Sequence, residues 1–360
     1  MIKNNFIRLI IIISFFIGFI FSSTPNVHFD RIKDIVVSYD NKFCITADLS
    51  GHINIWDLSM NEVLNSYTLE DEKRLYKISM SHDNSILAIG FENGEITLIN
   101  LIDGHEKTLS LQGNNKRIEM LKFISNSELI TYQDGELNIN FWKLISKDGD
   151  FKNIKLMLIH QLNGPEGSDS YLLNSKINRT NKVILGRLNN KNFSKWDIER
   201  KKIIKYSDKG SIVHKQEVLD TLIQSPIITN SYEIVKSPSM SGWKHNPYDY
   251  YQYAISPDGY KVAIAFHDEN NVIIWNSLFA EKDIYIDAHK YRVLDMEFSN
   301  DGKFIATSSI DKTLKIWSAH TGKLIKTIQL DNDFATDIAF SSKKIIYGTF
   351  KGQIKVEELN

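Results

Sequence analysis

Residues 289–317 read HKYRVLDMEFSNDGKFIATSSIDKTLKIW, and this stretch decides the fold. An apolar run at 293–298 is followed by the turn Ser-Asn-Asp-Gly, a second apolar run at 304–308 and an alternating run that ends at Trp317. Alternation with a period of two residues is typical of β-strands, and Ser, Asn, Asp and Gly favour the turns between strands. The stretch therefore predicts three consecutive antiparallel strands.

Similar segments recur along the chain. Each has up to four short β-rich runs, and the third run ends at one of seven positions separated by 43, 43, 54, 79, 42 and 40 residues: Trp56, Ile99, Trp142, Trp196, Trp275, Trp317 and Glu357. Self-similarity at this period, with four strands per unit, indicates a β-propeller built from stacked sheets. We therefore predict an all-β propeller of four-stranded antiparallel blades.

The number of blades depends on residues 209–249, which fit no strand pattern cleanly. The long gap between Trp196 and Trp275 accommodates either an irregular insertion or a degenerate extra blade. We predict seven blades plus an insertion, with eight blades as the alternative. The last unit, residues 331–360, ends after three strands and would leave an unpaired sheet edge. We expect the N-terminal residues 26–30 to pair with this C-terminal blade as its fourth strand and so to close the ring.

The quoted stretch resembles a blade of the WD-repeat β-propeller family. In that family a His in the loop entering the blade, a Ser or Thr on the second strand, an Asp in the next turn and the Trp form a buried hydrogen-bonded tetrad. The resemblance gives structural roles to four residues: His289, Thr307, Asp311 and Trp317. The first unit retains Thr46 and Trp56, but Ser50 stands where the turn Asp is expected. The resemblance covers roughly residues 26–360 and is clearest in 250–330.

The N-terminus has the pattern of a targeting segment. Lys3 and Arg8 precede a run from Leu9 to Phe21 that is apolar apart from Ser14 and Gly18. This run matches the apolar region of a secretory signal and is short for a membrane-spanning helix. We predict that residues 1–23 are a signal peptide or an uncleaved N-terminal membrane anchor. Residues 24–360 are then a single propeller domain exported to a secreted, periplasmic or secretory-pathway location.

Composition and motifs argue against several functional classes. The formal net charge is −1, so no long-range field attracts nucleic acid. Cys44 is the only cysteine, which excludes an intrachain disulfide and a thiolate zinc cluster. The sequence contains no His-x-x-x-His pair, nucleophile elbow or phosphate loop. We predict no catalytic residues, no metal site and no cofactor, and a propeller hydrolase is the least favoured function.

Two groups of side chains are candidates for partner binding. The first lies in loops that the family geometry places on one face: Arg74, Arg117, Tyr291 and Arg292. The second is the aromatic segment 243–253, where Trp243 and Tyr248 are suited to anchoring a protein interface or stacking on a sugar. We predict a non-catalytic scaffold for one or more protein partners. The alternative is a propeller that binds a glycan or small ligand through 243–253.

Overall fold

The structure, a computed structural model, describes residues 28–359 apart from 60–61, 70–72, 112–115, 137, 147–148, 163–171, 178–182, 189–192, 199–201, 208–234, 237–251, 266–269 and 277–283. Strands dominate these residues, and their one helical element is the short 3-10 helix η1, Phe151–Asn153. The prediction of an all-β fold is therefore confirmed. Of the segment 209–249, the structure describes only Val235 and Lys236.

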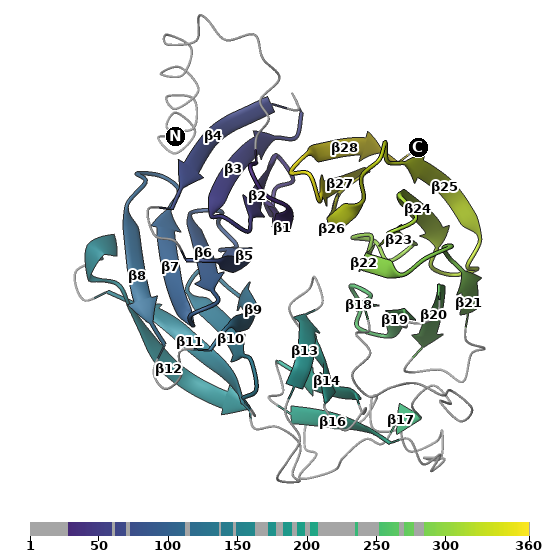
Figure 1. Cartoon of the computed structure of the whole chain (residues 1–360). Coiled ribbons are helices and arrows are strands. Elements are labelled where there is room, and N and C mark those ends of the chain that lie inside the picture. Colours follow the sequence, from purple (N-terminus) through teal and green to yellow (C-terminus); the bar gives the residue numbers. More distant parts are fainter. Residues whose placement is uncertain are drawn as a thin grey trace, which may run out of the picture.

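The strands form antiparallel sheets whose order in space follows their order in the chain (Figure 1). The first sheet contains β1 (Ile32–Val37), β2 (Phe43–Asp48), β3 (His52–Asp57) and β4 (Glu62–Thr68). The second contains β5 (Leu75–Met80), β6 (Ile86–Phe91), β7 (Glu95–Asn100) and β8 (Glu106–Ser110). The third contains β9 (Ile118–Phe123), β10 (Glu128–Gln133), β11 (Ile139–Ile145) and β12 (Lys155–Leu162).

The second half of the chain continues this plan. The next sheet contains β13 (Leu172–Ile177), β14 (Val183–Leu188), β15 (Phe193–Asp197) and β16 (Lys202–Ser207), and β17 (Val235–Lys236) pairs parallel to β16. It is followed by β18 (Gln252–Ile255), β19 (Lys261–Ala265), β20 (Asn271–Asn276) and β21 (Ile284–Asp287). Then come β22 (Val293–Phe298), β23 (Phe304–Ser309), β24 (Thr313–Ser318) and β25 (Leu324–Gln329). The last sheet contains β26 (Ala335–Ser341), β27 (Lys344–Thr349) and β28 (Ile354–Glu358).

The first strand of each sheet lies toward the centre of the molecule (Figure 1). These inner strands, β1, β5, β9, β13, β18, β22 and β26, each contact the next one, and β26 contacts β1. Three of these contacts include a hydrogen bond from a backbone N–H to a side chain of the preceding inner strand. Asp34 accepts from Ile78 N at 2.8 Å, Asp295 accepts from Ile338 N at 3.0 Å, and Ser79 accepts from Phe123 N at 2.9 Å.

Repeated turn chemistry sets the hairpin between the first and second strands of a sheet. Ser299 Oγ donates to Asp301 and accepts from Phe304 N, and Gly302 has a φ of 69°. In the first sheet Asn41 takes the same place with a φ of 57°, because Asn tolerates the left-handed region better than most residues. The Ser, Asn, Asp and Gly residues of these corners are therefore turn formers, as their positions in the sequence predict.

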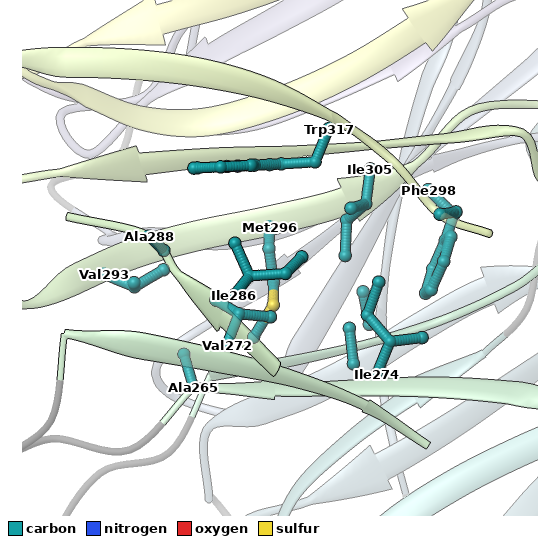
Figure 2. Close-up of a cluster of buried hydrophobic side chains, with 13 residues drawn as sticks. Ala265, Val272, Ile274, Ile286, Ala288, Val293, Met296, Phe298, Ile305 and Trp317 are labelled. Atoms are coloured by element: carbon teal, nitrogen blue, oxygen red, sulfur yellow. The ribbon is translucent and has the colours of Figure 1, made fainter. Parts of the chain in front are cut away.

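The hydrophobic core lies between neighbouring sheets. Figure 2 shows one cluster, in which Val272, Ile274 and Ile286 of one sheet pack against Met296 and Ile305 of the next. The alternation of each strand supplies these apolar faces, because side chains on a strand point to opposite sides of the sheet. Packing between neighbouring sheets therefore buries the apolar faces that single sheets would leave exposed.

The predicted strand at residues 26–30 is not found in the part of the chain that the structure describes. Residues 28–30 form a bend, the last sheet has three strands, and residues 26–27 lie outside the described ranges. The reason is local. The His28 ring is buried in the first sheet and Phe29 N donates to Asp48 Oδ2 at 3.1 Å, so the backbone at 28–30 is directed to the first sheet instead of to β28.

The first and last sheets nevertheless pack against each other. Ile32 of β1 lies in a buried cluster with Ile346 of β27. Thr336 Oγ1 donates to Ile32 O at 2.8 Å, and Lys344 Nζ donates to Leu58 O at 2.6 Å. The two ends of the chain are thus joined by side-chain packing and hydrogen bonds in the described residues.

Candidate interaction face

The quoted stretch forms a buried polar network around Thr307. His289 Nε2 lies 2.7 Å from Thr307 Oγ1, and Trp317 Nε1 donates to the same oxygen at 2.9 Å. His289 Nδ1 lies 3.0 Å from Asp311 Oδ2, which also accepts from Lys290 N at 3.0 Å. The structure thus brings together the four residues that the family resemblance singled out, and they link the loop before β22 to the β23–β24 turn.

A second network of this kind lies in the first sheet, and the sequence analysis missed two of its members. His28 Nε2 lies 2.7 Å from Thr46 Oγ1, and Trp56 Nε1 donates to that oxygen at 2.8 Å. Its carboxylate is Asp48, whose Oδ2 lies 3.3 Å from His28 Nδ1 and whose Oδ1 accepts from Ser50 Oγ at 3.0 Å. Spacing could have identified His28, because the His-to-Thr and Thr-to-Trp separations of 18 and 10 residues are the same in both networks.

The carboxylates of both networks are held in the charged form. Burial raises the pKa of Asp48, but hydrogen bonds from His28 and the His52 backbone outweigh it and bring the pKa down to about 2. The pKa of Asp311 is also lowered, because bonds from Thr313 and Lys290 offset its burial. Burial lowers the pKa of His289, which favours the neutral ring. These groups act structurally: they fix loops at one end of the sheets.

That end carries a repeated arginine. In four sheets the residue before the inner strand is Arg, and its carbonyl accepts from the turn between the second and third strands: Arg31 from Leu49 N, Arg74 from Glu92 N, Arg117 from Asp134 N and Arg292 from Ile310 N. Each distance is between 2.9 and 3.2 Å. These loops and turns form what we name the loop face. The sequence analysis selected three of these arginines and missed Arg31, which precedes Arg74 by the repeat spacing of 43 residues.

Acidic neighbours neutralise part of the loop face. Arg117 Nε donates to Glu119 at 2.6 Å, and its Nη2 lies 3.3 Å from Asp134. Arg74 lies 4.0 Å from Glu92, and Lys73 lies 3.0 Å from Glu95. The cations of the second and third sheets are therefore paired with acids of the neighbouring turns, which limits the electrostatic attraction they exert on a partner.

A cluster of charged and aromatic side chains lies on the inner strands of the first three sheets. Lys33 Nζ lies 3.9 Å from the ring centre of Tyr76, and the Arg117 guanidinium lies 4.6 Å from the same ring. Burial and, to a smaller extent, the charge of Lys77 lower the pKa of Lys33 to about 8. Lys33, Tyr76 and Glu119 were not among the residues predicted from the sequence to bind a partner. The missed signal is their 43-residue spacing, which equals the first two spacings of the Trp series.

The perturbed groups of this cluster are engaged by neighbours. Burial raises the pKa of Glu119, but the carboxylate is bonded to Arg117. Lys77 lies 3.8 Å from Asp34, and that charge is the main cause that raises the pKa of Lys77. The arrangement suits polar contacts with a partner at the centre of the face. It presents no base aligned with a nucleophile among the described residues.

The remaining candidates fall into two sets. Tyr291 and Arg292 lie on the loop face directly before β22, and both are exposed. Trp243, Tyr248 and most of the aromatic segment 243–253 lie outside the described residues. Within the described ranges, no group of three or more His, Cys, Asp or Glu side chains is placed to hold a metal ion. In the same part of the chain, no helix has the length and apolar character needed to cross a bilayer.

Comparison with known proteins assigns the repeat. The family model described as WD domain, G-beta repeat matches residues 21–57 and 282–318. The chain carries WD repeats. Each matched WD-repeat segment contains one of the two His-Thr-Trp networks and ends one residue beyond its Trp. The matched unit 282–318 runs from β21 of one sheet to β24 of the next, so the WD repeat of the sequence straddles two sheets.

Curated relatives agree with the WD-repeat assignment. The COMPASS component SWD3 of Saccharomyces cerevisiae is 30% identical over 28% of this chain and 32% of its own length. The transcriptional corepressor LEUNIG_HOMOLOG of Arabidopsis thaliana is 35% identical over 25% of this chain and 12% of its own length. The WD repeat-containing protein slp1 of Schizosaccharomyces pombe is 20% identical over 81% of this chain and 59% of its own length. The matches thus span less than two thirds of each relative.

Proposed function

We propose that this WD-repeat chain is a non-catalytic scaffold that holds one or more protein partners on its loop face. The observation that carries the proposal is a set of four loops that present Arg31, Arg74, Arg117 and Arg292 from equivalent positions of four sheets. A backbone hydrogen bond to the next turn holds each loop, and buried networks also fix those of Arg31 and Arg292. A rigid face loses little conformational entropy on binding, which favours affinity. SWD3 is named as a component of an assembly, COMPASS, which supports protein partners as the ligand class.

The architecture we propose for this scaffold is a closed ring of seven blades. The succession of inner strands from β1 to β26, and the contact of β26 with β1, support this count. Closure by an N-terminal strand remains our proposal for the segment before His28. The fourth strand of the fifth sheet, β21, ends two residues before His289. By analogy, we propose that the closing strand ends two residues before His28, which is slightly earlier than the predicted range 26–30.

We also propose that the scaffold is exported, or tethered to a membrane through residues 1–23 only. The order of basic residues, apolar run and mixed-charge segment at the N-terminus supports this placement. Fractionation of the native host, followed by N-terminal sequencing of the recovered protein, tests it. A mature chain found in the cytosol that still begins at Met1 contradicts export.

Affinity capture from membrane and soluble fractions of the host tests the scaffold function. Wild-type protein is expected to retain a defined partner, and the triple variant Arg74→Ala, Arg117→Ala, Arg292→Ala is expected to retain less of it. A matched triple variant of lysines away from the loop face, Lys42→Ala, Lys303→Ala and Lys323→Ala, serves as the control. A wild-type protein that captures no partner from either fraction contradicts the proposed function.

A further inference from the structure

Three aromatic side chains are exposed on one part of the loop face. Phe29 is 80% exposed, Tyr291 is 61% exposed and Phe350 is 48% exposed. They belong to loops of the first sheet, the β22–β25 sheet and the last sheet, which are neighbours around the ring. Large apolar groups gathered on one exposed face mark interaction sites, and aromatic side chains dominate the energy of such sites.

Direct contacts join these loops into one surface. Lys312 Nζ donates to Asn332 Oδ1 at 3.0 Å, which connects the β23–β24 turn to the loop before β26. The rings of Phe334 and Phe350 have centroids 4.9 Å apart. At Gly352 the β27–β28 turn meets the loop before β1 so closely that an added Cβ would lie 2.7 Å from His28 O. We name this surface the aromatic rim, and it consists of residues 28–31, 289–292, 310–312, 331–334 and 350–353.

The aromatic rim carries an excess of exposed positive charge. Its exposed cations are Arg31, Lys290, Arg292, Lys312 and Lys351, and its exposed carboxylates are Asp30 and Asp331. The other two aspartates of the rim form hydrogen bonds within it: Asp311 with His289, and Asp333 with the backbone N–H groups of Phe334 and Lys351.

We propose that the aromatic rim binds an acidic segment of a protein partner that carries aromatic or aliphatic side chains. Apolar groups of that segment pack on Phe29, Tyr291 and Phe350, and its carboxylates lie beside the five exposed cations. Charge complementarity sets the approach and orientation of the segment, and the exposed rings supply the buried contact area. This inference rests on the proposed scaffold function and assigns it a location and a partner chemistry.

The test uses an unbiased probe. A phage-displayed library of random 12-residue peptides is selected on the full chain, and recovered peptides are measured by fluorescence anisotropy. We expect recovered sequences to be rich in Asp, Glu and aromatic residues. We expect the variant Phe29→Ala, Tyr291→Ala, Phe350→Ala to weaken their binding at least tenfold. Tyr285→Ala is the matched control, because Tyr285 is 66% exposed and lies on β21, away from the rim, and this variant should bind as wild type does.

Several outcomes overturn the inference: a library that yields no binder, binders without an acidic excess, or binders that the triple variant retains. Preferential binding of wild type to phosphatidylserine vesicles, lost in the triple variant, assigns the rim to a lipid surface and also overturns it. The scaffold function is judged separately. A host partner that wild type captures and the rim variant still captures leaves the scaffold function standing and removes the rim as its site.

Discussion

At the scale of single residues, Thr307 and Thr46 are the centres on which the loop face depends. A hydroxyl can donate one hydrogen bond and accept two. Because Trp317 Nε1 donates to Thr307, the hydroxyl proton is free to be donated to His289 Nε2, and Nδ1–H then faces Asp311. This tautomer satisfies every member of the network with a neutral ring, in agreement with the lowered pKa of His289.

Replacing Thr307 with Val should therefore destabilise the protein. The change keeps the shape but leaves the Trp317 Nε1–H and the His289 Nε2 without their hydrogen-bond partner in a buried site, at a cost of about 2–4 kcal/mol. Urea unfolding followed by Trp fluorescence measures the effect. Thr327→Val on the exposed side of β25 is the control and should be neutral. Equal midpoints for the two variants would contradict the role given to Thr307.

The buried carboxylates should make the stability of the folded protein sensitive to acid. The folded pKa of Asp48, about 2, lies below its unfolded value of 3.8, so this stabilisation is complete above pH 3.8 and is lost as pH falls toward 2. The shift corresponds to about 2 kcal/mol. The lowered pKa of Asp311 likewise makes the folded protein less stable as the pH falls. The lowered pKa of His289 adds a loss of stability below pH 6.5, because the ring binds protons more readily in the unfolded chain. Asp48→Asn should be less stable than wild type at pH 7 and should show a smaller further loss between pH 4 and 2.5, as measured by urea midpoints.

At the scale of elements, neighbouring sheets approach each other so closely at two points that the second strand of a sheet must carry glycine there. A Cβ added to Gly348 on β27 would lie 2.5 Å from the Cβ of Ile32 on β1, and one added to Gly90 on β6 would lie 2.8 Å from Ile118 Cγ2 on β9. Both glycines therefore face the inner strand of a neighbouring sheet. The Gly348 contact joins the two ends of the chain, and the Gly90 contact joins sheets that are consecutive.

Gly348→Ala should destabilise the protein by about 1–3 kcal/mol, because the methyl group forces Ile32 or its strand to move. Combining it with Ile32→Ala should recover part of the loss, and a double-mutant cycle from chemical unfolding measures the coupling. Gly90→Ala, measured in the same way, tests the corresponding contact between two sheets that are consecutive in the chain. Additive effects of the Gly348 and Ile32 changes would show that the first and last sheets do not pack as described.

At the scale of the whole molecule, the contact between the first and last sheets combines residues almost a full chain length apart. Lys344 Nζ donates to Leu58 O and lies 3.4 Å from Glu358. Such contacts link the last sheet to the first, so that in the described residues each sheet has a neighbour on both sides. We expect unfolding to be one cooperative transition.

The variant Lys344→Met with Thr336→Val removes two of the polar contacts across this junction. It should lower the free energy of unfolding by about 1–3 kcal/mol and broaden the thermal transition, because the end sheets can separate first. Calorimetry measures both effects. Lys303→Met, which breaks an exposed ion pair with Asp301, is the control and should change little. An unchanged transition in the double variant would place the stability of the ring elsewhere.

Strand positions were predictable because they depend on the side-chain pattern of residues that are adjacent in the sequence. The apolar runs at 293–298 and 304–308 were expected as strands. The structure has the first as β22, Val293–Phe298, and extends the second by one residue to Ser309. Asp48 escaped prediction because the first unit exchanges Ser and Asp in its turn: Asp48 occupies the place of Ser309, and Ser50 that of Asp311. His28 was missed because residues 26–30 were assigned to a strand, although its spacing to Thr46 matches that of His289 to Thr307. The Lys33–Tyr76 contact escaped because it joins two inner strands that are separate in sequence.

The sequence by itself determined the alternating strands, their turn residues and the repeat that resembles the WD family, since all of these follow from local side-chain periodicity and backbone preference. Only the tertiary structure decided that Phe29, Tyr291 and Phe350 share one face and that β1 packs against β26 and β27. The physical reason is that the packing of the last sheet against the first brings together residues that are far apart in the sequence. No local pattern encodes which side chains then become neighbours across the junction.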